Sequence, residues 1–136
     1  MNGSKDLGTL IGRVLLALIF VVSGFGKITS FAGTASFMAG SGIPAGLVTP
    51  ALILTILVEF GCGLLVVIGF RTRLAALVIF LWLIPVTYIF HFTPYHHGTN
   101  AMINMIMMLK NISMMGGLLF VASMGPGTYS VDGSDG

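Results

Sequence analysis

The sequence predicts an all-α integral membrane protein, a bundle of four transmembrane helices. Of its 136 residues, 56% are hydrophobic and only 7% are charged, whereas a soluble domain of this size carries about 25% charged residues. Its mean hydropathy is +1.04. Four apolar segments of about 20 residues each are long enough for a helix to cross a hydrocarbon core of ~30 Å. Because lipid offers the backbone no hydrogen-bond partners, spans of this length are predicted as helices and not as barrel strands of about 10 residues.

We expect one membrane domain over residues 1–136, with spans at about 7–27, 50–70, 73–92 and 101–124. The first span is longer than the apolar region of a signal peptide. Lys27 closes it without a good small-residue cleavage site. We therefore interpret it as a retained helix.

Local signals place the boundaries of the second and third spans. Thr49 followed by Pro50 predicts a helix N-cap and a first-turn proline. The short stretch "GFRTR" at 69–73 predicts a tight turn, so that these two helices form an antiparallel hairpin. Pro85 is expected to kink the third helix.

The segments outside the spans are short. Residues 28–49 are rich in small residues and lack charge, and we expect them at the membrane interface. Residues 92–100 connect the third and fourth spans. Residues 125–136 form a polar, glycine-rich tail that cannot continue a helix.

The few positive charges predict an orientation. Lys5 flanks the first span, and Arg71 and Arg73 lie in the turn between the second and third. In a four-span protein these positions fall on the same side, opposed by Lys27. The positive-inside rule therefore predicts that both termini are cytoplasmic.

Three ionisable residues, Arg13, Glu59 and Lys110, lie within the spans, where each costs about 3 kcal/mol to insert. Glu59 and Lys110 each lie nine residues from the start of their span, about 13 Å deep from the same side. Arg13 lies roughly 21 Å from Lys27 along its helix, which leaves about 7 Å to the plane of Glu59. We therefore expect an Arg13–Glu59–Lys110 cluster inside the bundle.

Neutral and charged neighbours extend this cluster. Ser23 and Lys27 fall near the helix face that carries Arg13, and Asn111 is adjacent to Lys110. The net positive charge of the cluster favours an anionic ligand or the oxygens of a quinone-like carbonyl compound. The alternative is structural, because buried polar groups sometimes only fix the register of helices.

Other candidate residues have simpler interpretations. His91, His96 and His97 lie around the loop between the third and fourth spans and could bind a metal or move protons, or could belong to a solvated loop. The methionines of the fourth span could bind Cu(I), but packing accounts for them more simply. The single cysteine, Cys62, excludes an intrachain disulfide and a site with several thiolates. We predict no metal site.

Four stretches of the sequence resemble one known family: "GRVLLALIFVVSGFGKI", "FAGTASFMAGSGIP", "LVEFGCGLLVVIGFRTRLAAL" and "MLKNISMMGGLLFVASMGPGTYSVD". They resemble, in order and spacing, the DoxX family of small bacterial inner-membrane proteins over roughly residues 8–132. The family pattern is matched at the following positions: Arg13, Ser23, Gly24, Lys27, Glu59, Gly69, Thr72, Arg73, Lys110, Asn111, Gly116 and Gly117.

The resemblance implies a multi-pass protein of the bacterial inner membrane that is linked to quinone-dependent oxidoreductases. In that hypothesis Arg13 and Lys110 stabilise a quinone oxygen, and Glu59 orients them or accepts a proton. Ser23, Lys27 and Asn111 add further contacts to the cofactor. No flavin, haem, Walker or Rossmann motif is present, so a soluble oxidoreductase partner would supply the electron carrier.

Two other functions stay open. The protein could be a non-catalytic anchor for a soluble redox or detoxifying partner, docked at the "GFRTR" turn and the tail. It could also be a small transporter, for which four spans would require a homo-oligomer. Nothing in the sequence indicates binding of nucleic acid. The protein is expected to be surrounded by the lipid bilayer.

Overall fold

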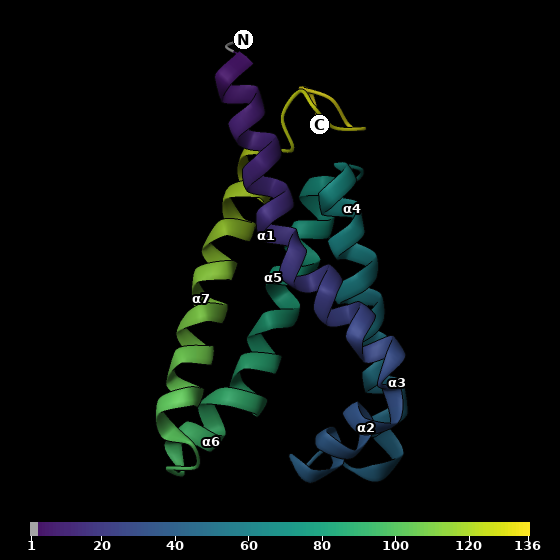
Figure 1. The fold of residues 1–136 in the computed structure, drawn as a ribbon, viewed down its shortest axis with the longest axis vertical. Helices are drawn as coiled ribbons and strands as arrows, with labels where there is room; N and C mark the ends of the chain where they lie inside the picture. The colour runs from purple at the N-terminus through teal and green to yellow at the C-terminus, as the bar shows by residue number, and fades with distance from the viewer. Residues whose placement is uncertain (1–2) are drawn as a thin grey trace.

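The structure is a computed structural model that describes residues 3–136, and it is helical throughout its ordered elements (Figure 1). The helices are α1 (Gly3–Thr29), α2 (Phe31–Gly40), α3 (Ala45–Ile56), η1 (Leu57–Cys62), α4 (Gly63–Ile68), α5 (Thr72–Thr87), η2 (Tyr88–Phe92), α6 (Thr93–His96) and α7 (Ala101–Met124). The described residues form no β-strand.

Within residues 3–136, four helical stretches are long and apolar enough to cross a membrane: Gly3–Thr29, Ala45–Ile68, Thr72–His96 and Ala101–Met124. These confirm the all-α, four-span prediction. Apolar side chains such as Leu15, Val22 and Phe120 are exposed along their outer faces. Such a surface is stable in lipid and would aggregate in water.

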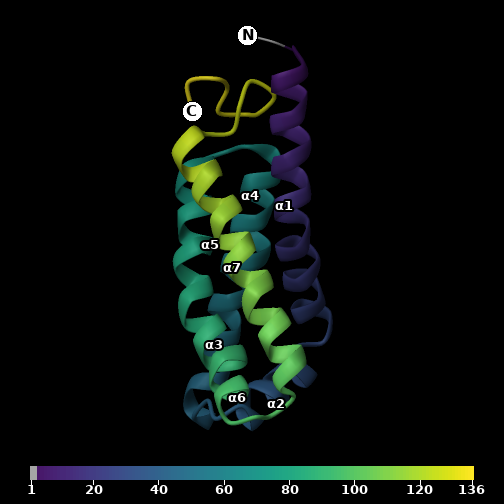
Figure 2. The ribbon, with the colours of Figure 1, turned by 90° about the vertical axis from the view of Figure 1, so that its left-hand side faces the viewer.

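The four long segments form two arms. Helix α5 packs along α7, and α1 packs along η1 and α4. The two arms meet near the chain ends and diverge toward α2 and α6 (Figure 1). In the turned view of Figure 2, α5 and α7 lie toward the viewer. The start of α1, the turn between α4 and α5, and the C-terminal tail lie together at one end, here called the terminal end. The membrane side that this end faces stays a prediction.

The second span begins earlier than predicted, and the N-cap assigned to Thr49 is wrong. Helix α3 starts at Ala45, directly after Pro44, whose extended backbone (φ −56°, ψ 139°) precedes the helix. Pro50 lies inside the helix. Neighbouring helices and local adjustments compensate for a proline within a membrane helix.

Two π-helical turns interrupt the spans. The first, η1, joins α3 to α4, and the second, η2, follows α5 three residues after Pro85. The helix therefore widens into a π-helical turn shortly after Pro85, the residue at which a kink was expected. Single π-turns within α-helices occur frequently at functional sites.

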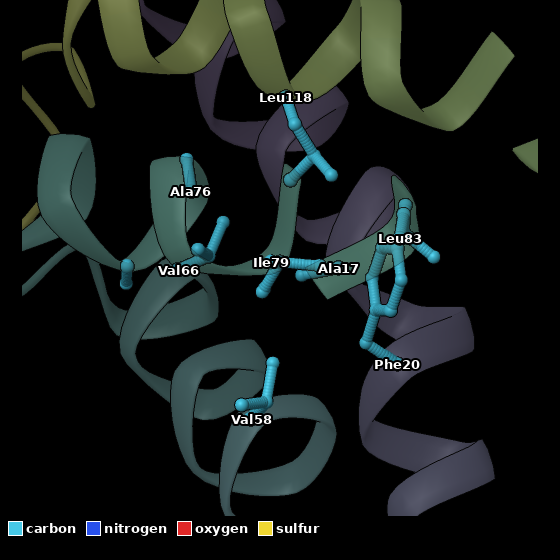
Figure 3. Close-up of a cluster of buried hydrophobic side chains, with 9 residues drawn as sticks. Ala17, Phe20, Val58, Val66, Ala76, Ile79, Leu83 and Leu118 are labelled. Atoms are coloured by element: carbon cyan, nitrogen blue, oxygen red, sulfur yellow. The ribbon is translucent and has the colours of Figure 1, made fainter. Parts of the chain in front are cut away.

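The hydrophobic core lies where the arms meet. Figure 3 shows its buried side chains, which come from all four long segments: Ala17, Phe20, Val58, Val66, Ala75, Ala76, Ile79, Leu83 and Leu118. Trp82 packs against this core, as expected for its position in the middle of a span. A smaller cluster of Met38, Val48 and Leu52 joins α2 to α3.

Helix α1 approaches η1 very closely at one glycine. A Cβ atom at Gly24 would lie 2.6 Å from the backbone nitrogen of Phe60 and 2.9 Å from its Cα. Only glycine permits this separation of the two backbones. The contact brings the polar face of α1 against the turn that carries Glu59.

Candidate functional site

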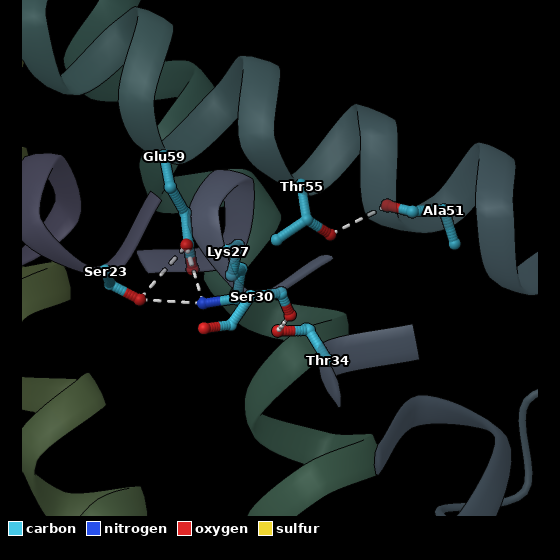
Figure 4. A network of polar contacts seen from close by, with 7 residues as sticks. All are labelled: Ser23, Lys27, Ser30, Thr34, Ala51, Thr55 and Glu59. Atoms are coloured by element: carbon cyan, nitrogen blue, oxygen red, sulfur yellow. Dashed lines mark hydrogen bonds and ion pairs between the residues drawn. The ribbon is translucent and has the colours of Figure 1, made fainter. Parts of the chain in front are cut away.

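Three polar side chains form a compact network between α1 and η1 (Figure 4). Lys27 Nζ lies 2.9 Å from Glu59 Oε2 in an ion pair, and it also donates to Ser23 Oγ at 2.7 Å. Ser23 Oγ donates to the same carboxylate oxygen at 3.2 Å. All three groups are thus hydrogen-bonded together, which offsets the cost of placing them in a membrane span.

The local sequence accounts for this geometry. Ser23 and Lys27 are four residues apart and therefore share one face of α1. Gly24 between them permits the close approach of η1, which carries Glu59, and only 9% of the surface of Glu59 is exposed. The site is built by one helix face, one glycine and one π-turn.

The network lines a cavity of about 220 Å³ that lies between the two arms. Its polar lining comes from both arms: Ser23, Lys27, Thr34, Thr55, Glu59, His91, Lys110 and Asn111. Its apolar lining is Ile19, Phe20, Phe37, Met38, Leu83, Val86, Phe90 and Met114. Ligand pockets for drug-sized molecules measure roughly 300–1,000 Å³. The cavity therefore suits a ligand with a single ring or of similar size.

Lys110 gives the cavity its excess charge. Its Nζ contacts Met107 Sδ at 3.3 Å, and thioether sulfur is a weak acceptor. Within residues 3–136 the salt bridge of Lys27 with Glu59 is the one ion pair found, so no carboxylate compensates Lys110. With all three groups ionised, two ammonium groups and one carboxylate leave one positive charge. The arrangement favours a negatively charged or strongly polarised oxygen.

Asn111 and His91 complete the lining of the α5–α7 arm. Asn111 is buried, and its Nδ2 donates to Thr87 Oγ1 at 3.0 Å, which joins α7 to α5. His91 lies on η2, and its Nδ1 is 3.2 Å from Asn104 Oδ1. The sequence placed His91 near a loop, and the structure shows that it lines the cavity.

The expected Arg13–Glu59–Lys110 cluster is not formed. Arg13 is buried near the terminal end, where its guanidinium donates to the carbonyl oxygens of Pro126, Val67 (3.2 Å) and Tyr129 (2.9 Å). Val67 follows Glu59 by eight residues, about 12 Å along the helix. Depth counted from residue numbers missed this because the long side chain of Arg13 extends toward the tail and not toward Glu59.

The C-terminal tail is folded over the α4–α5 turn and is held there by contacts that the sequence did not predict. Asp132 accepts hydrogen bonds from the backbone N–H groups of Arg71 and Thr72, both at 2.9 Å, and from Thr72 Oγ1 at 2.8 Å. Thr128 donates to the buried carboxylate of Asp6 at 3.1 Å. The tail therefore caps the start of α5.

These contacts lower the pKa of Asp132. The largest cause is the hydrogen bond from the backbone N–H of Thr72. The hydroxyl of Thr72 and the backbone N–H and charge of Arg71 act in the same direction, while burial opposes them. The signal in the sequence was an aspartate in a glycine-rich tail, which by itself does not identify its partner.

Within the part of the chain that the structure describes, no group of three His, Cys, Asp or Glu side chains lies close enough to hold a metal ion. His96 and His97 pack ring against ring at 5.8 Å near α6, away from the lining of the cavity. The chemistry available in the cavity is hydrogen bonding, charge stabilisation and proton exchange.

Comparison with known proteins identifies relatives. The family model described as DoxX matches residues 8–92. The chain is 39% identical over 132 residues to "Inner membrane protein YqjF" of Escherichia coli (strain K12), covering 97% of this chain and 95% of that protein. It is 35% identical over 131 residues to "Inner membrane protein YphA" of the same organism, covering 96% and 92%.

A more distant relative comes from another organism. "Putative oxidoreductase CatD" of Bacillus subtilis (strain 168) is 34% identical over 84 residues, covering 62% of this chain and 60% of that protein. No solved structure matches the chain.

Proposed function

The chain belongs to the DoxX family, and from that premise we propose that it is a quinone-linked oxidoreductase component of the bacterial inner membrane. The observation that supports this most directly is the hydrogen-bonded network of Lys27, Glu59 and Ser23, which lines a cavity of mixed polar and apolar character between membrane spans. Such intramembrane groups mark ligand or proton sites in membrane proteins.

The lining of the cavity matches the two parts of a quinone. Phe20, Phe37 and Phe90 provide aromatic surface for a planar ring. The ammonium groups of Lys27 and Lys110 stabilise the negative charge that develops on a ring oxygen during reduction. A quinone becomes a quinol by taking up two electrons and two protons. Glu59, which keeps Oε1 outside its contacts with Lys27 and Ser23, exchanges one of these two protons with the bound ring, and water exchanges the other.

The electrons come from a partner in this proposal. The chain has one cysteine and no sequence motif for a flavin or haem, so we assign the electron carrier to a soluble oxidoreductase. The name of CatD supports a redox assignment for a relative of this chain. Arg13 holds the tail and acts outside the quinone cavity.

Binding of a short-chain ubiquinone to the purified protein in lipid nanodiscs tests this function. Protein-free nanodiscs measure how much ubiquinone dissolves in the lipid alone. We expect Glu59→Gln and Lys110→Met each to weaken binding about tenfold, because each removes a charged hydrogen-bonding group. Lys5→Met is the matched control, since it removes an exposed ammonium at the terminal end. Equal binding by the folded cavity variants and the wild type would refute the site.

The same variants distinguish a non-catalytic anchor. If Glu59→Gln and Lys110→Met retain the redox activity of the native membrane complex together with their partner, the cavity is not used and the anchor function is favoured.

A further inference from the structure

His91 lies on the wall of the cavity that faces the Lys27–Glu59 network. Lys27 and Glu59 belong to the arm formed by α1, η1 and α4, whereas His91 belongs to η2 on the arm formed by α5 and α7 (Figure 1). Both π-helical turns of the protein thus contribute one ionisable side chain to the same cavity, from opposite arms. A ligand between the arms meets polar groups on two sides.

The protonation of the neutral His91 ring is fixed by its neighbours. Asn104 Nδ2 donates to the carbonyl oxygen of Thr99 at 2.8 Å, which orients the amide so that Oδ1 faces His91. This oxygen only accepts, so His91 Nδ1 carries the hydrogen of their 3.2 Å contact. In the neutral ring Nε2 is then the acceptor. The described residues form no hydrogen bond with that nitrogen.

We propose that His91 Nε2 is the second recognition point of the cavity and accepts a hydrogen bond from the far hydroxyl of a 1,4-dihydroxy ring. This inference rests on the proposed quinone function and deepens it. The near oxygen binds the charged groups at Lys27 and Glu59, and the far hydroxyl binds His91. The cavity is therefore specific for rings with oxygen atoms at two opposite positions, and Asn104 is a positioning residue that sets the His91 tautomer.

Two ligands that differ by one oxygen atom test the inference: 2,3,5,6-tetramethylhydroquinone and 2,3,5,6-tetramethylphenol. Their substituted rings do not add to the thiol of Cys62. Affinities are measured under anaerobic conditions by equilibrium dialysis against the protein in lipid nanodiscs. The wild type is expected to bind the hydroquinone about tenfold more tightly, as one additional hydrogen bond provides. The phenol occupies the charged network, because charge-assisted hydrogen bonds are the stronger ones.

His91→Leu is expected to reduce the affinity for the hydroquinone to that for the phenol, and to leave the affinity for the phenol unchanged. His97→Leu is the matched control and keeps the tenfold preference. Asn104→Leu lowers the preference without abolishing binding of the phenol.

Each other outcome overturns the inference. An unchanged preference in His91→Leu, or equal weakening of both ligands, shows that His91 does not bind the far hydroxyl, while the proposed quinone function stands. If the wild type binds neither of these ligands nor a short-chain ubiquinone, the proposed function fails and this inference fails with it.

Discussion

Replacing Gly24 with alanine tests whether the close contact of α1 with η1 builds the site. A Cβ at this position would lie 2.6 Å from Phe60 N, 2.7 Å from its Cβ and 2.9 Å from its Cα. Ordinary carbon contacts begin at about 3.5 Å. The nearest carbon contact, at 2.7 Å, therefore requires the two helices to separate by about 0.8 Å, and the backbone of a transmembrane helix cannot rotate away as a flexible side chain would.

Two measurable effects follow from this separation. Overpacking of this kind costs about 1–3 kcal/mol of the free energy of unfolding. The movement also lengthens the 2.9 Å contact between Lys27 Nζ and Glu59 Oε2 toward about 3.7 Å, beyond hydrogen-bond range. Gly24→Ala is thus expected to lower both stability and quinone binding.

Gly26→Ala is the matched control. It makes the same change in the same helix, where an added Cβ has no neighbour within 4 Å. Both variants gain the same helix propensity, so the difference between their unfolding free energies isolates the clash. Unfolding in mixed micelles with increasing sodium dodecyl sulfate is followed by far-UV circular dichroism. Equal stability of the two variants would refute the close-contact argument.

Three further predictions concern the terminal end. Because the pKa of Asp132 is lowered in the folded protein, its contacts stabilise the docked tail at neutral pH. This contribution is lost as the pH falls below about 4 through the folded-state pKa. Hydrogen exchange at the Thr72 amide should therefore accelerate below about pH 4, and Asp132→Asn should remove this pH dependence. Arg13→Met leaves three carbonyl acceptors without their donor and weakens tail docking by about 1–3 kcal/mol. Digestion of the tail by carboxypeptidase should become faster, while quinone binding is retained. A loss of quinone binding would instead place Arg13 in the site. Both termini are expected in the cytoplasm, so a reporter fused after residue 136 should be active only there; activity on the opposite side would reverse the orientation.

The spans could be predicted closely because their signal is local. The fourth is predicted at 101–124 and observed at Ala101–Met124, and the third extends only a few residues further than predicted. Length and apolar composition decide whether a segment crosses lipid. The start of the second span was predicted wrongly, because Pro50 lies inside helix α3, which begins at Ala45 directly after the extended backbone of Pro44.

The candidate site could be predicted only in part. Glu59 and Lys110 were identified as costly ionisable groups within spans, and Ser23 and Lys27 as their neighbours. The structure places all four around one cavity. The partner of Glu59 was misassigned because Arg13 and Lys27 lie on the same helix. Counting residues along helices gives depth but not the direction in which a long side chain extends.

By itself, the sequence determined the class of the protein, because an apolar chain with four long hydrophobic segments has no stable alternative to helices in lipid. The tertiary structure alone decided which charges meet. Gly24 allows α1 to reach η1, which pairs Lys27 with Glu59, and the divergence of the arms brings His91 into the same cavity. The tail captures Arg13 through the backbone carbonyls of Pro126 and Tyr129, which carry no signature in the sequence. Such contacts join residues far apart in the chain, and only the packing of the helices fixes them.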